Sequence, residues 1–157
     1  MALSVFILLT FLICSLFVAI KKELTIVENT FIYLLILVIS INVSWIISHE
    51  LKFIKVTKDP VNNSAFLFYR SILLPMIIVV YVNLIQRVNT LTRSLLITLA
   101  FLIIMLLLSW LAVYFDIFTY KKWNFGYDLL YFALLQLISF YAFKFFRKID
   151  HREVKYS

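Results

Sequence analysis

Residues 95–115 read LLITLAFLIIMLLLSWLAVYF, an apolar stretch without a single charged residue. A helix needs about 20 apolar residues to cross the roughly 30 Å hydrocarbon layer of a bilayer, and this stretch is long enough. It is too long for a β-strand, and it lacks the alternation of polar and apolar residues that a half-buried strand shows. A helix also satisfies its backbone hydrogen bonds internally, as lipid surroundings demand. The stretch therefore predicts a membrane-spanning helix.

Four further runs of the same kind occur along the chain, at residues 2–20, 31–48, 65–85 and 126–143. The 157 residues are 64% hydrophobic, against roughly 45–50% in an ordinary soluble domain. Mean hydropathy is +1.03, and a water-soluble fold of this size cannot bury so much apolar surface. We therefore predict an all-α membrane protein in which residues 1–157 form a single transmembrane domain. It is a bundle of five transmembrane helices, followed by a short basic cytoplasmic tail over residues 144–157.

The first run resembles a secretory signal in its apolar core, but no Lys or Arg precedes it. Residues 17–21 form a poor cleavage site, so the run is interpreted as a retained first helix. The distribution of Lys and Arg predicts the orientation. Nine of them fall in the segments on one side of the predicted bundle. Five fall on the other side, namely Lys52, Lys55, Lys58, Lys121 and Lys122. This excess predicts that the N-terminus lies outside and the C-terminus inside.

Three scarce residue types exclude several classes of site. Gly126 is the one glycine, whereas a phosphate loop, a dinucleotide fingerprint and a glycine-lined selectivity filter each need several. Cys14 is the one cysteine, so neither an intrachain disulfide nor a cysteine-based metal site is expected. The two histidines, His49 and His151, are too far apart in sequence to form a metal motif. We therefore predict no metal and no cofactor.

Polar residues inside the runs indicate which helix faces avoid lipid. Ser40, Ser44 and Ser48 recur every four residues, a spacing that lets two helix backbones approach closely, so they are interpreted as a helix-packing face. Asn42 and His49 lie on the opposite side of the same helix, which is therefore expected to be central in the bundle. The polar stripes of the last two runs are expected to face the bundle interior, and they include Ser109, Asp116, Asp128, Gln136 and Ser139.

The antiparallel order of consecutive helices predicts a polar cluster at one membrane surface. The ends of the second and fourth runs and the starts of the third and fifth meet there, at His49, Glu50, Arg70, Asp116 and Asp128. We expect Arg70 to pair with Asp116 or Asp128, because a guanidinium can donate two hydrogen bonds to one carboxylate. Alternatively, Arg70 extends to the lipid headgroups. Such a cluster is compatible with a structural ion pair, with a site for an anionic ligand or lipid headgroup, and with a catalytic or proton-relay site.

Aromatic and basic residues near the ends of the runs are typical of membrane interfaces. Residues 116–125 combine aromatic side chains with Lys, as in an interfacial belt. Lys144, Arg147 and Lys148 are predicted to contact anionic lipid headgroups of the inner leaflet. Because anchoring and orientation account for the net charge of +7, no nucleic-acid partner is predicted.

Two blocks of sequence carry a family resemblance: residues 66–70 (FLFYR) followed by Leu74-Pro75, and residues 110–116 (WLAVYFD) followed by Trp123-Asn124. In order and spacing they resemble a family of small, uncharacterised multi-pass membrane proteins from endospore-forming Gram-positive bacteria. The resemblance implies that the family's fourth-helix acidic residue corresponds to Asp116 and that its tryptophan-rich start of the fifth helix corresponds to Trp123. It implies the cytoplasmic membrane of a low-GC Gram-positive bacterium, and it assigns no chemistry.

Three functions remain open from the sequence. We expect an integral membrane protein without enzymatic activity, an accessory or scaffolding subunit that contacts a protein partner in the bilayer through its helices. The first alternative is a small-solute carrier or substrate-binding membrane component, with an enclosed polar cavity near Asn42, Tyr81 and Gln136. Low glycine content and a single mid-helix proline, Pro75, count against the broken helices of many carriers. The second alternative is an intramembrane enzyme, for which no nucleophile–base spacing is present.

Overall fold

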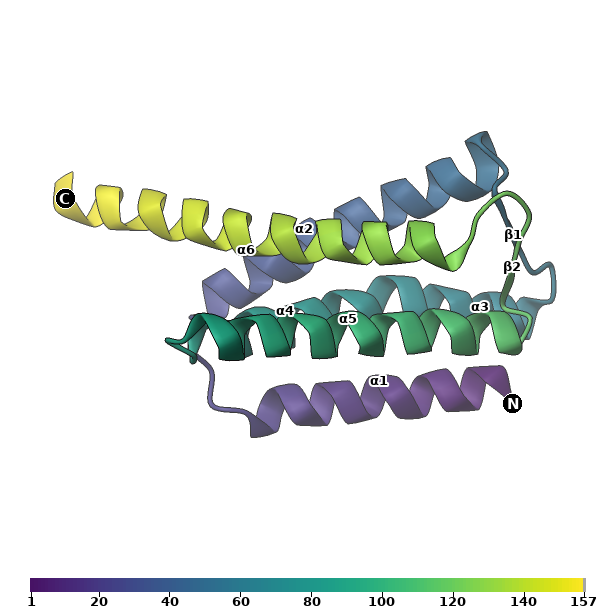
Figure 1. The fold of residues 1–157 in the computed structure, drawn as a ribbon, viewed down its shortest axis with the longest axis horizontal. Coiled ribbons are helices and arrows are strands. Elements are labelled where there is room, and N and C mark those ends of the chain that lie inside the picture. The colour runs from purple at the N-terminus through teal and green to yellow at the C-terminus, as the bar shows by residue number, and fades with distance from the viewer. Residues whose placement is uncertain (157) are drawn as a thin grey trace.

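The computed structural model describes the backbone of residues 1–156 and the side-chain surroundings of residues 1–152. Its elements are six α-helices, two π-helical turns (η) and two short strands (Figure 1). In chain order they are α1 (Ala2–Ala19), α2 (Ile26–Trp45), η1 (Ile46–Glu50), β1 (Ile54–Val56), α3 (Pro60–Phe68), η2 (Tyr69–Leu73), α4 (Leu74–Gln86), α5 (Leu91–Tyr114), β2 (Phe118–Tyr120) and α6 (Phe125–Tyr156).

Five helical segments are long and apolar enough to cross a membrane, as the sequence predicted: Ala2–Ala19, Ile26–Glu50, Pro60–Gln86, Leu91–Tyr114 and Phe125–Arg152. The third starts earlier than predicted. Its Asp59 side chain accepts a hydrogen bond from the Asn62 N–H, and Pro60 occupies the first turn, where a missing N–H costs nothing. The predicted tail is helical too, since α6 continues to Tyr156 and contains no proline.

Two loops pair as short strands at one end of the bundle, a feature that the all-α prediction did not include. Strands β1 and β2 run antiparallel, with Lys55 opposite Thr119. We call this end, where the N-terminus also lies, the sheet end (Figure 1). The α1–α2 and α4–α5 connections lie at the opposite end, the far end, past which the last turns of α6 extend. Phe118, which belongs to β2 and was expected in an interfacial belt, is instead buried against Phe66 and Tyr69.

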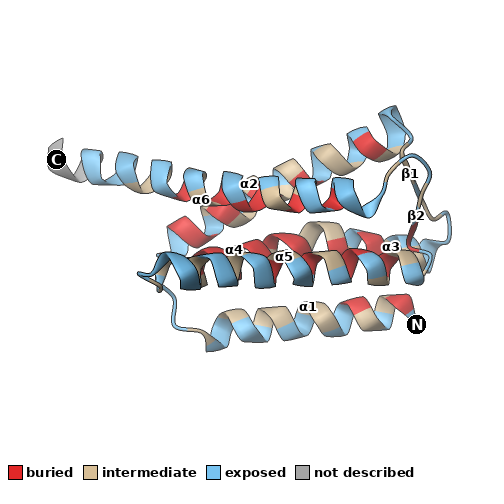
Figure 2. Ribbon diagram, viewed as in Figure 1, coloured by how far each residue is buried: buried red, intermediate tan, exposed pale blue. Residues whose placement is uncertain are grey.

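The third of these long helical segments, Pro60–Gln86, lies at the centre of the bundle, and the second, Ile26–Glu50, does not. These segments are called spans below. In the most apolar window of the third span 67% of the residues are buried, against 22% in the second span. Helices α1, α2, α5 and α6 all pack against α4, which carries apolar residues around its whole circumference. The other helices expose their outer faces, and in α1 only Ala2 and Phe6 are buried (Figure 2). The expectation of a central second helix was wrong because its polar residues are not all covered, and Asn42 is exposed.

A proline in the third span explains how α2 is attached to it. Pro75 has no N–H, so it cannot donate a hydrogen bond to a carbonyl of the preceding turn. The neighbouring Leu74 N–H is already bonded to the Tyr69 carbonyl in the π-helical turn. The carbonyls of Arg70 and Ser71 are therefore left without a donor from their own helix. Side chains of α2 supply the missing donors. The Ser40 hydroxyl donates to the Arg70 carbonyl at 3.1 Å, and the Tyr33 hydroxyl donates to the Ser71 carbonyl at 3.0 Å. These bonds join the two helices.

Two residues with side chains occupy the left-handed backbone region, which provides a stability prediction. Lys52 and Asp116 both have φ of 53°. A side chain with a Cβ is strained there, and Asp tolerates the conformation better than Lys. We expect Lys52→Gly to raise the free energy of unfolding by about 0.5–1 kcal/mol, and Asp116→Gly to raise it less. SDS titration in mixed micelles would measure both changes, and a loss of stability in Lys52→Gly would contradict the prediction.

Candidate functional site

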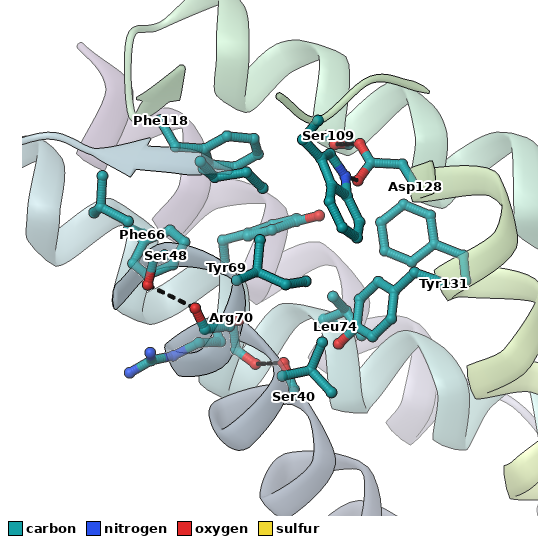
Figure 3. Close-up of a pocket in the computed structure, with 17 residues that line it drawn as sticks. Ser40, Ser48, Phe66, Tyr69, Arg70, Leu74, Ser109, Phe118, Asp128 and Tyr131 are labelled. Carbon is teal, nitrogen blue, oxygen red and sulfur yellow. Dashed lines mark hydrogen bonds between the residues drawn. The ribbon is translucent and has the colours of Figure 1, made fainter. Parts of the chain in front are cut away.

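A cavity of about 60 Å³ lies beneath the sheet, between α2, η1, η2, α5 and α6 (Figure 3). This volume can hold a few water molecules. Phe66, Phe118 and Phe132 form much of its apolar wall. Its polar lining comes from several elements and consists of Ser40, Ser44, Ser48, Tyr69, Arg70, Ser109, Trp123, Asp128 and Tyr131.

Both π-helical turns border this cavity. η1 contributes Ile47 and Ser48, and η2 contributes Tyr69 and Arg70. A π-helical turn inserts one extra residue into an α-helix and re-aims the side chains that follow, and such turns are frequent at functional sites. The sequence analysis did not anticipate either turn. Pro75, which leaves carbonyls of η2 without helical donors, is a local signal for η2 but not for η1.

Asp128 organises one wall of the cavity. Its Oδ2 accepts hydrogen bonds from the Ser109 hydroxyl, at 2.5 Å, and from the Tyr120 hydroxyl, and its Oδ1 accepts one from Trp123 Nε1 at 2.7 Å. The Ser109 and Tyr120 hydroxyls also lie 2.9 Å apart. Asp128 stands in the first turn of α6, where the helix dipole favours a carboxylate. The carboxyl group therefore connects α5, β2, the loop after β2 and α6.

Tyr120 is a hydrogen-bond donor in this group. Burial raises the pKa of its phenol above the ordinary value of 10, and the hydrogen bond to Asp128 raises the pKa further. The hydroxyl therefore keeps its proton at neutral pH and donates to the carboxylate. Neither Tyr120 nor Trp123 was identified as a site residue from the sequence, where both fell within the predicted interfacial belt. Both residues lie more than ten positions after Ser109, and no sequence pattern indicated that all three would meet at Asp128.

Arg70 does not form the expected ion pair. Among the described residues the ion pairs are Arg87–Glu23 and Arg147–Glu28, so the predicted pairing of Arg70 with Asp116 or Asp128 is wrong. Long helical side chains lean toward the helix N-terminus, and the Arg70 guanidinium accordingly lies over the Phe66 ring, 5.2 Å from its centroid. It points away from Asp128 (Figure 3). The alternative, in which Arg70 extends to the lipid headgroups, stays a prediction.

The five predicted cluster residues are therefore divided between two places. Arg70 and Asp128 both line the cavity, where the Asp128 oxygens are occupied by other donors. His49, Glu50 and Asp116 are exposed at the sheet end. The His49 ring stacks near Trp45, and its Nδ1 lies 2.9 Å from the Ser48 hydroxyl. The order of the helices brings all five residues to the same end of the bundle. They are separated there because the helices present them on different faces.

Most of the polar residues predicted to face inward do so, since Ser109, Asp128, Gln136 and Ser139 are buried, but Asp116 is exposed because it lies beyond the end of α5. The packing face of α2 is only partly as predicted, because Ser40 bonds to the third span while Ser44 and Ser48 line the cavity. The residues expected around a carrier cavity are placed differently. Gln136 Nε2 donates to the Thr98 carbonyl, the Tyr81 hydroxyl lies 3.2 Å from the Thr98 hydroxyl, and Asn42 is exposed.

A second polar group lies at the far end. Arg147 donates to both carboxylate oxygens of Glu28, at 2.9 and 3.2 Å, and Glu28 also accepts the Thr25 N–H. The Arg147 guanidinium is thus engaged by α2 rather than directed only at lipid headgroups. The Lys144 ammonium lies over the Phe140 ring and Lys148 is exposed, so lipid contact by these two residues stays a prediction.

The Glu28–Arg147 pair supports a second stability prediction. Glu28 is 5% exposed, so removal of its cationic partner would leave a buried carboxylate unpaired. We expect Arg147→Gln to lower the free energy of unfolding by about 2–3 kcal/mol, below the range for fully buried pairs because Arg147 is partly exposed. Lys148→Gln removes the same charge one residue away and should have little effect. Equal stability of the two variants would contradict the prediction.

Comparison of the chain with protein-family models, with curated proteins and with solved structures found no match. The resemblance carried by residues 66–75 and 110–124 therefore stays a prediction. The candidate site is defined by its own geometry, which is a small mixed polar and aromatic cavity, an organised carboxyl group on one wall and an unpaired arginine on another.

Proposed function

We propose that this chain is a non-enzymatic integral membrane protein that binds a small polar ligand in the cavity beneath the sheet. It would act as the substrate-binding or accessory component of a larger membrane assembly. One observation supports this proposal above the others. Arg70 Nε and the Tyr131 hydroxyl are buried without a hydrogen-bond partner among the described residues, and both residues line the same cavity.

Buried side-chain nitrogen and oxygen atoms without a hydrogen-bond partner are few among the residues whose side chains the structure describes. The buried side chains of Glu28, Asn29 and Asn83 all have partners, and one further unbonded atom, Gln136 Oε1, belongs to a residue that does not line the cavity. Each such atom costs about 1–3 kcal/mol, so a stable protein keeps few of them without a reason. A ligand that accepts from Arg70 and bonds with Tyr131 would remove two of the three.

The lining narrows the chemistry of the ligand. Arg70 Nε is a donor, whereas the Tyr131 and Ser44 hydroxyls can each donate or accept. A small ligand with at least one acceptor oxygen fits these groups and the aromatic walls around them. The lining argues against acid–base chemistry, because both Asp128 oxygens already accept hydrogen bonds and His49 is exposed outside the cavity.

The proposal includes an orientation and a location. The nine-to-five distribution of Lys and Arg supports a C-terminus inside and a sheet end outside. The location, the cytoplasmic membrane of a low-GC Gram-positive bacterium, is proposed from the family resemblance alone. A cysteine introduced at the exposed position Thr119 would then react with a membrane-impermeant maleimide on intact cells. Reaction only after the cells are lysed would reverse the orientation. Co-purification of a larger membrane protein in mild detergent would support the accessory role.

Tyr131→Phe tests ligand binding in the cavity. In an empty cavity, loss of an unbonded hydroxyl should leave stability unchanged or raise it. With a bound ligand, the variant should retain less of it. Native mass spectrometry of protein released from mild detergent measures the retained mass, and we expect Tyr131→Phe and the cavity-filling Ser44→Phe both to reduce it.

Tyr141→Phe is the matched control for this experiment, because Tyr141 lies on the same helix with its side chain exposed. It should retain the ligand as the unmodified protein does. If no small molecule is retained by the unmodified protein, or if both cavity variants retain as much as Tyr141→Phe, the proposed function is wrong.

A further inference from the structure

A second hollow opens on the surface of the sheet end, beside the cavity, and Ser48, Ile54 and Val56 line both. It measures about 300 Å³, and its lining includes three lysines, Lys52, Lys55 and Lys121, together with Ser48 and His49. Its lining, within residues 1–152, contains no carboxylate. Like charges that converge in this way repel each other unless an anion lies between them.

The fold assembles these three lysines from separate segments. Lys52 follows η1 and holds a left-handed backbone, and Lys55 is exposed in the middle of β1. Lys121 follows β2, and its N–H donates to the Phe53 carbonyl at 2.8 Å, which joins the two loops beside the hollow. The pairing of the strands therefore brings Lys121 next to lysines far from it in sequence.

The lysines are not neutralised within the chain. The ion pairs of the described residues involve Arg87 and Arg147, both near the far end, so no carboxylate lies within ion-pair distance of Lys52, Lys55 or Lys121. A basic residue after the last turn of a helix interacts favourably with the helix dipole, which accounts for Lys52. The dipole does not account for Lys55 or Lys121, which lie in and after strands.

A neighbouring hollow provides a contrast within the same molecule. It measures about 310 Å³ and is lined by Lys55 and Lys58, but also by Asp116. A carboxylate in its wall opposes an anionic occupant. The two hollows are similar in size and share Lys55, so they differ mainly in the charge of their walls. An anion should therefore favour the hollow lined by Lys52 and Lys121.

We propose that the hollow lined by Lys52, Lys55 and Lys121 binds a phosphate group with net negative charge. Lys ammonium groups bind phosphate as point charges, and the lining hydroxyl and imidazole of Ser48 and His49 add hydrogen-bonding capacity. Such a group is present in a free phosphate or diphosphate and in the headgroup of an anionic phospholipid. Because the three lysines that define the hollow do not line the cavity, this proposal does not depend on the ligand that the cavity binds.

The first arm of the test uses inorganic pyrophosphate and the full chain in a phosphate-free detergent. ³¹P NMR line broadening would follow binding at constant ionic strength maintained with chloride. We expect Lys55→Gln and Lys121→Gln each to weaken binding about tenfold, since each removes one of three converging charges. Lys52→Arg keeps the charge and should keep binding.

The second arm uses nanodiscs with equal amounts of phosphatidylglycerol and phosphatidylcholine. Native mass spectrometry would count the lipids that remain on the released protein. Preferential retention of phosphatidylglycerol that is lost in Lys121→Gln, without pyrophosphate binding, assigns the phosphate to a lipid headgroup. Pyrophosphate binding that is weakened in the same variants, without a lipid preference, assigns it to a free anion. If both occur, the hollow accepts phosphate from either source.

Lys58→Gln and Lys122→Gln are the matched controls, because they remove the same charge at the same end without lining this hollow. Both should bind as the unmodified protein does, and circular dichroism should show equal helix content in every variant. The proposal is wrong if neither probe binds, or if the control variants lose binding as fully as Lys55→Gln and Lys121→Gln.

Discussion

Asp128→Ala is expected to lower the free energy of unfolding by about 3–4 kcal/mol, one of the two largest effects of a single substitution proposed for this chain. Asp128 is 5% exposed, and its two oxygens accept from Ser109, Tyr120 and Trp123. Its loss leaves the Trp123 indole N–H without a partner. The Ser109 and Tyr120 hydroxyls would keep only the hydrogen bond between them. The start of α6 would lose its hydrogen bonds to α5 and β2.

SDS titration in mixed micelles would measure this loss, and two further variants define its cause. Asp128→Asn keeps an acceptor for Trp123 but directs an amide donor at two hydroxyl donors, so an intermediate loss of about 2 kcal/mol is expected. Glu50→Ala removes an exposed carboxylate at the same end and should change stability by about 0.5 kcal/mol or less. If Asp128→Ala were as stable as Glu50→Ala, the carboxyl group would not organise this wall.

Asn83→Asp is expected to have the other large effect, a loss of about 3–5 kcal/mol, although the two side chains have nearly the same shape. Asn83 is fully buried in α4. Its oxygen accepts from the Glu23 and Leu24 N–H groups, and its nitrogen donates to Asn29 Oδ1 at 2.7 Å and to the Val79 carbonyl at 2.9 Å. An aspartate would place an oxygen against two acceptors and bury a charge.

Gln86→Glu is the matched control, since it makes the same change from amide to acid at a partly exposed position near the end of the same helix. It should cost about 0.5 kcal/mol or less, as most surface substitutions do. Because Asn83 binds the loop before α2, the Asp variant should also expose that loop to limited proteolysis. A stable Asn83→Asp variant with an intact loop would show that this network contributes little to stability.

The helices and their interior stripes were predictable, whereas the interactions of individual polar side chains were not. Ser109, Asp128 and Gln136 were expected to face inward and are buried, because a polar side chain avoids lipid wherever the bundle offers an alternative. The partner expected for Arg70 was wrong. Its guanidinium lies over Phe66 on its own helix, while Asp128 is occupied by donors from the loop after α5.

Composition and the lengths of the apolar runs were sufficient by themselves to predict five apolar helices and which connections share an end. Apolar length and alternating direction are properties of each segment, so they can be read from the chain without knowing how the segments pack. Only the tertiary structure decided that α4 is central, that two loops pair as strands and that three lysines converge beside them. Those features depend on the rotation and axial position of each helix against the others, which arise from the packing of the whole bundle.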